Sequence, residues 1–101
     1  MIIPNKLKIG GHVYKVVRED AMSDEEALFG HCVTRKLQIY IDSRPAQSQQ
    51  EETLIHEVMH AICRQISAFP RDEAGSEMEE RVVQGLGHGM YQFLKENNFI
   101  I

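Results

Sequence analysis

The chain has 101 residues, of which 43% are hydrophobic and 26% charged, which is typical of one globular domain with one core. Its net charge of -4 and its scattered Lys and Arg argue against a nucleic-acid or anionic-lipid partner, and no apolar run approaches the ~20 residues of a membrane span. The first residues lack the pattern of a signal peptide, and two cysteines, Cys32 and Cys63, are too few for a disulfide framework, so we expect a cytoplasmic protein.

The first 42 residues have the alternation and the Val and Tyr content of β-strands. Four short strands are predicted, paired as two hairpins, at residues 6–9, 12–18, 30–34 and 37–42. Gly10 and Gly11 fit the first turn because glycine adopts positive φ angles readily, and Arg35 and Lys36 lie at the second turn. The acidic segment 20–29 between the hairpins is expected to be a loop or a short helical turn.

The remainder of the chain is predicted to form two long helices, separated by a break at Pro70. Ser48 and Glu51 match a capping box, so the first helix is predicted to run from there to about Ile66. The second is predicted to begin between Asp72 and Ser76 and to end near Glu96. Three of its residues lower helix propensity but are expected to permit close approach of a neighbouring backbone: Gly85, Gly87 and Gly89.

These elements predict one α+β domain over residues 1–101, in which a small, mostly antiparallel twisted sheet of three or four strands packs on the two helices. The predicted apolar stripe of the second helix comprises Val82, Val83, Leu86, Met90, Phe93 and Leu94.

The first helix carries the motif H-E-x-x-H at residues 56–60. His56 and His60 project from one side of a helix on successive turns, so both imidazoles can reach one zinc ion at ~2.0–2.1 Å. In this motif the carboxylate of Glu57 acts as general base towards a metal-bound water. The two histidines lie ~140° from the centre of the apolar stripe of this helix, and therefore face another element that can supply a third ligand.

Two adjacent carboxylates on the second helix, Glu79 and Glu80, are the candidates for that ligand. Glu79 falls at the centre of the predicted apolar stripe and Glu80 ~100° away. Because a lone buried charge is costly, a carboxylate in the middle of a buried face requires a partner, so we favour Glu79 and keep Glu80 as the alternative. Glu79 could instead belong to a capping box with Ser76, if the helix begins there.

Other residues could take part in the chemistry. Cys63 lies near the histidine flank and is an alternative ligand, whereas Ile66 occupies the position of the last histidine of metzincins and excludes that arrangement. His88 could stabilise an oxyanion if the second helix lines the site. The phenols of Tyr40 and Tyr91 could donate to a tetrahedral intermediate, although packing roles are more common for both.

The order of these motifs resembles that of small gluzincin-like zinc metallopeptidases of phages and prophage regions, which are distantly similar to the ImmA/IrrE-type peptidases. The resemblance covers about residues 30–94 and depends on three segments: 37–42, 53–61 and 79–83. It implies a small twisted sheet on two helices, with His56, His60 and Glu79 as zinc ligands and Glu57 as general base. It also implies that strand 37–42 is an edge strand that holds an extended peptide.

The sequence therefore predicts a peptidase with one Zn²⁺ ion and a protein or peptide substrate. The alternatives are a zinc-binding regulatory or host-interaction protein of phage origin without catalysis, and a small interaction module in which the motif has no function.

Overall fold

The computed structural model describes residues 1–20 and 29–100. In chain order its elements are β1 (Lys6–Ile9), β2 (His12–Glu19), β3 (Gly30–Val33), the 3-10 turn η1 (Thr34–Lys36), β4 (Gln38–Asp42), α1 (Gln47–Gln65) and α2 (Glu73–Glu96). The predicted α+β class, with four strands followed by two long helices, is confirmed. The expectation for segment 20–29 falls almost entirely on residues 21–28, which lie outside the described part of the chain.

The four strands form one mixed sheet in the order β1-β2-β4-β3. Both predicted hairpins are present as antiparallel pairs, and Gly10 and Gly11 have positive φ angles of 56° and 84° in the first turn. The hairpins join through a parallel pairing of β2 with β4, so the sheet is not purely antiparallel. This order places β4 inside the sheet and leaves β1 and β3 as its edges. The expectation that strand 37–42 is an edge strand was therefore wrong.

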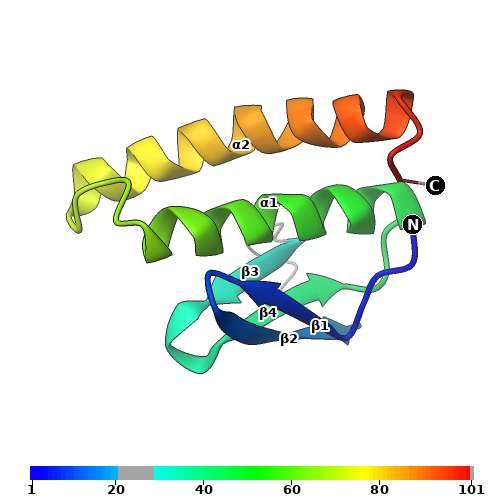
Figure 1. Cartoon of the computed structure of the whole chain (residues 1–101), viewed down its shortest axis with the longest axis horizontal. Coiled ribbons are helices and arrows are strands. Elements are labelled where there is room, and N and C mark those ends of the chain that lie inside the picture. The colour runs from blue at the N-terminus through cyan, green and yellow to red at the C-terminus, as the bar shows by residue number, and fades with distance from the viewer. Residues whose placement is uncertain (21–28, 101) are drawn as a thin grey trace.

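Three layers are stacked in the molecule: the sheet, then α1, then α2 (Figure 1). The sheet buries the side chains of Tyr14, Val16, Ile39 and Ile41 against α1, which contributes Leu54 and Ala61 to the same core. Helix α2 lies on the opposite side of α1, away from the sheet (Figure 1). Neither described helix contains a stretch that is long and apolar enough to cross a bilayer.

The buried face of α2 differs from the predicted apolar stripe. The buried residues of α2 are Gly75, Val83, Gly87 and Tyr91, whereas Val82, Leu86, Met90 and Phe93 are all exposed. This difference arises because α2 packs on α1 and not on the sheet (Figure 1), and small residues let the two helices approach closely. A Cβ atom at Gly87 would lie 3.4 Å from Met59 Sδ and 3.6 Å from His56 Cα. The expected close backbone approach is therefore confirmed at Gly87, while Gly85 and Gly89 face open space.

Both helices begin differently from the capping-box predictions. Ala46 is the N-cap of α1, so Ser48 lies inside its first turn and does not cap it. Glu51 is instead buried between the helices, where its carboxylate accepts hydrogen bonds from the Tyr91 hydroxyl at 2.9 Å and from Lys95 Nζ at 3.4 Å. Asp72 caps α2 by accepting the backbone N–H of Gly75 at 2.7 Å. Glu79 is consequently well inside α2 and free of any capping role.

Candidate metal centre

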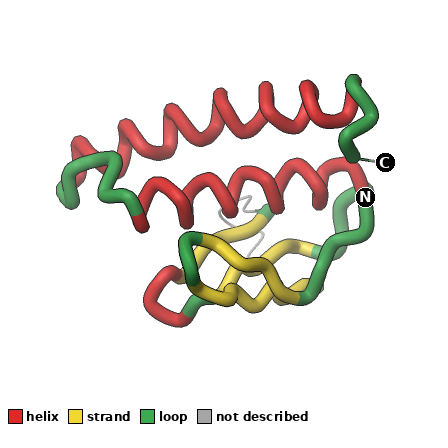
Figure 2. Tube along the Cα trace, in the orientation of Figure 1, coloured by secondary structure: helices red, strands yellow, loops and turns green. Residues whose placement is uncertain are grey.

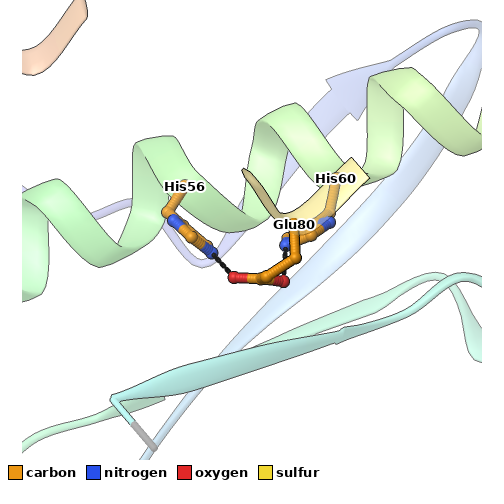
Figure 3. Close-up of side chains that lie close together, drawn as sticks. All are labelled: His56, His60 and Glu80. Atoms are coloured by element: carbon orange, nitrogen blue, oxygen red, sulfur yellow. Dashed lines mark ion pairs between the residues drawn. The ribbon is translucent and has the colours of Figure 1, made fainter. Parts of the chain in front are cut away.

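Two imidazoles of α1 and one carboxylate of α2 converge at the middle of the helix pair. Glu80 Oε1 lies 3.2 Å from His56 Nε2, and Glu80 Oε2 lies 2.9 Å from His60 Nε2. Figure 3 shows this carboxylate placed between the two rings, with a dashed line to each. His60 is buried and the Glu80 side chain is 55% exposed, so the group is anchored on α1 and open to solvent on the α2 side.

Glu79, the third ligand that the sequence favours, lies on the other side of the His60 ring from Glu80. Its Oε2 atom lies 2.7 Å from His60 Nδ1, the ring nitrogen on the other side from Glu80, and accepts a hydrogen bond from Arg64 Nε at 3.2 Å. The structure thus brings Glu80, and not Glu79, to the Nε2 atoms of both histidines. Glu79 is the less exposed of the two glutamates, with a side chain 14% exposed against 55% for Glu80, as its central position in the predicted stripe indicated, but the histidine atom that it contacts is Nδ1 of His60.

The three-residue group fits a divalent metal. The donor atoms of His56, His60 and Glu80 all lie within 4.8 Å of one another. Two ligands at ~2.0–2.1 Å from one tetrahedral zinc ion lie about 3.3 Å apart, close to the Nε2–carboxylate distances of 2.9 and 3.2 Å. Two imidazoles and one carboxylate form a donor set found in catalytic zinc sites, which keep a fourth position for water. The donor types of these three residues therefore fit the zinc ion that the H-E-x-x-H motif predicts.

Glu57 lies beside this group in the same cavity. The cavity has a volume of about 780 Å³, and Glu57, His56, His60 and Glu80 all line it. The Glu57 residue is only 5% exposed. Burial, with a further contribution from the negative charge of Glu80, raises the pKa of Glu57 to about 7, although Arg64 opposes the shift. A carboxyl group with a pKa near neutrality can both accept and return a proton at pH 7.

The surroundings of the two histidines affect the protonation of His56 and the orientation of the His60 ring. Burial and the neighbouring His60 lower the pKa of His56, against the opposing effect of Glu80. The neutral form of an imidazole, which has a lone pair for a metal, is thereby favoured. The hydrogen bond at His60 Nδ1 further directs Nε2 of that ring towards Glu80.

Strand β3 forms part of the wall of the metal cavity, and the sequence analysis did not predict this contribution. Gly30 and Cys32 line the cavity, and burial raises the pKa of the Cys32 thiol to about 11. Arg64 Nη1 donates to the carbonyl oxygen of Cys32 at 2.9 Å, which links α1 to the edge of β3 that faces away from β4. The position of Arg64 at i+4 from His60 is the one sequence signal that could have indicated this contact.

Gly30 permits the close packing of β3 on α1, which leads to a prediction. A Cβ atom at Gly30 would lie 2.6 Å from both Thr53 Cγ2 and the carbonyl oxygen of Tyr40, and the latter is backbone. We expect Gly30→Ala to lower the free energy of unfolding by ~1–3 kcal/mol through overpacking, measured by urea denaturation. Gly85→Ala is the control: it faces open space in α2 and should raise stability by roughly 0.5–1 kcal/mol. Equal stability of Gly30→Ala and the parent protein would contradict the packing described.

The other candidate residues are placed as follows. His88 of α2 also lines the metal cavity, and its Nδ1 atom pairs with Glu52. The Tyr91 hydroxyl is used by Glu51, and the Tyr40 ring stacks on His31 with ring centroids 4.5 Å apart. Cys63 is not part of the three-residue group and lines a second cavity.

Comparison with known proteins gives no relative for this chain: no protein-family model, curated protein or solved structure matches it.

Proposed function

We propose that this chain is a zinc-dependent peptidase of the gluzincin-like type, in which His56, His60 and Glu80 hold the metal and Glu57 is the general base. The observation that supports the proposal most strongly is the convergence of both Nε2 atoms on one carboxylate, with a buried glutamate in the same cavity. The two cysteines of the chain are both free thiols, which suits a reducing compartment such as the cytoplasm.

The chemistry assigned to each residue follows from its surroundings. Zinc held by His56, His60 and Glu80 would supply a water of lowered pKa and would polarise the peptide carbonyl. Glu57 would take one proton from the attacking water as the water oxygen adds to the carbonyl carbon, and would pass that proton to the leaving amine as the C–N bond breaks. Glu79 accepts the Nδ1 proton of His60 and keeps Nε2 of that ring available for the metal.

The edge of β3 that faces away from β4 pairs with no other strand of the described residues, and it is the place where an extended peptide would lie. The backbone N–H of Asp42 in β4 donates a hydrogen bond to the carbonyl oxygen of Phe29, the residue before β3. This hydrogen bond indicates which backbone groups of β3 face β4. By alternation, the N–H and C=O groups of Gly30 and Cys32 face away from β4, and of these the Cys32 carbonyl already accepts a hydrogen bond from Arg64 Nη1 at 2.9 Å. The β-augmentation expected at strand 37–42 is therefore reassigned to β3, whose first residues line the metal cavity.

Metal-dependent hydrolysis of a random peptide pool tests the proposal. Cleavage that stops on chelation and returns with zinc supports a peptidase. Chelator-induced unfolding without any cleavage would instead support the alternative, a zinc-binding regulatory protein that keeps the site for stability.

A further inference from the structure

A second cavity, of about 690 Å³, lies beside the metal cavity, at the end of the molecule where α1 passes into α2. Its walls come from the C-terminal turn of α1, the connection to α2, the first turns of α2 and the turn η1. Figure 2 shows this connection and the 3-10 turn at the same end of the molecule. Six residues define its chemistry: Arg35, Arg64, Arg71, Phe69, Asp72 and Glu79.

The cavity has unbalanced positive charge. Its two carboxylates are already engaged, because Asp72 caps α2 and Glu79 pairs with His60 and Arg64. Arg35 and Arg71 are exposed and make no hydrogen bond or ion pair with any residue of the described ranges 1–20 and 29–100. Two arginines that line one cavity thus have no partner in the described part of the chain.

The two cavities are neighbours that share Arg64 as a lining residue. Arg64 also donates to the Cys32 carbonyl at the edge of β3 that faces away from β4. The first residues of β3 line the metal cavity, whereas Thr34 and Arg35, which follow the strand directly, line the second cavity. An extended chain advances ~3.3 Å per residue, so a peptide beside β3 reaches the second cavity within a few residues of the metal.

We propose that the second cavity is a substrate subsite for a carboxylate, and that Arg35 and Arg71 determine this specificity; the inference rests on the proposed peptidase function. A guanidinium presents paired N–H donors that match the two oxygens of a carboxylate, which makes Arg the side chain best suited to this group. The carboxylate belongs either to an Asp or Glu side chain of the substrate or to its C-terminus.

The test is peptide binding to the Glu57→Gln protein, with zinc and again with chelator. The probes are fluorescent decapeptide pools with one position fixed as Glu or Gln, each made with a C-terminal carboxylate or an amide. Fluorescence anisotropy should give about 5- to 10-fold tighter binding either for the Glu pools over the Gln pools or for the C-terminal carboxylate pools over the amide pools. The first result identifies a side-chain carboxylate as the group bound, and the second identifies the C-terminus. Arg35→Gln with Arg71→Gln should abolish this preference. The matched control, Lys8→Gln with Lys36→Gln, removes two charges that do not line the cavity and should retain it.

The outcomes separate this inference from the proposed function. A carboxylate preference that depends on the two arginines, in a protein that cleaves no pool before Glu57 is replaced, supports carboxylate binding in the second cavity and refutes the peptidase. Cleavage with equal binding of all four pools refutes the subsite and leaves the peptidase. In an active enzyme the double arginine variant should raise KM for the preferred pool with kcat unchanged. Absence of binding by every pool overturns the inference.

Discussion

Replacing Glu57 by Gln is expected to lower kcat for peptide hydrolysis by ~10²- to 10⁴-fold, the usual contribution of a general base. The amide has nearly the shape of the carboxylate but cannot accept the proton of the attacking water. Glu57 is buried in the metal cavity and is not among the three residues whose donor atoms converge, so zinc content should remain that of the parent protein. Single-turnover cleavage of a peptide pool and metal analysis on the same sample measure both effects.

The control for this change is Glu77→Gln, which removes one carboxylate from an exposed position of α2 outside both cavities. It should leave both zinc content and cleavage rate unaltered. Undiminished cleavage by Glu57→Gln would rule out the assigned role of Glu57. Loss of zinc together with activity would mean that Glu57 acts in metal binding instead.

The second large effect concerns the two adjacent glutamates of α2. We expect Glu80→Gln to weaken zinc binding by more than ~100-fold, because a charged ligand is lost from the three-residue group. Glu79→Gln should weaken it by only ~10- to 100-fold, the range for a residue that orients a ligand through a hydrogen bond. Competition with a chromophoric chelator measures these affinities, with Glu77→Gln again as the control.

The opposite order of the two affinities would contradict the assignment. If Glu79→Gln has the larger effect, the carboxylates exchange roles when the metal binds, and Glu79 is the ligand. Equal and small effects of both changes would mean that neither glutamate completes the site.

Local patterns in the sequence were enough to predict the α+β class, the two hairpins and the two helices. The turn glycines and the alternation of residues 37–42 act over short distances, so neighbouring residues reveal them. The pairing of β2 with β4 joins strands that are distant in the chain, and no local pattern reports it. The same limit explains why β4 was expected at an edge of the sheet.

The sequence favours Glu79, whereas the structure places the Glu80 carboxylate beside the two Nε2 atoms. A helical wheel ranks faces by apolar content, and it gives no weight to the buried Gly75 and Gly87 that set the true contact face of α2. With this contact face, the Glu80 carboxylate lies beside the Nε2 atoms of both histidines. Glu79 instead contacts Nδ1 of His60 and Nε of Arg64. The contribution of Cys32 and Arg64 was missed because it depends on how β3 packs against α1.

The measurement that tests the central claim most directly is cleavage of a random peptide pool by protein purified without a His-tag, with zinc content determined on the same sample. We expect one zinc ion per chain, cleavage that a chelator stops, and recovery of cleavage when zinc is restored. Protein that contains no stoichiometric zinc, or that holds one zinc ion per chain and cleaves no peptide of the pool, would contradict the account.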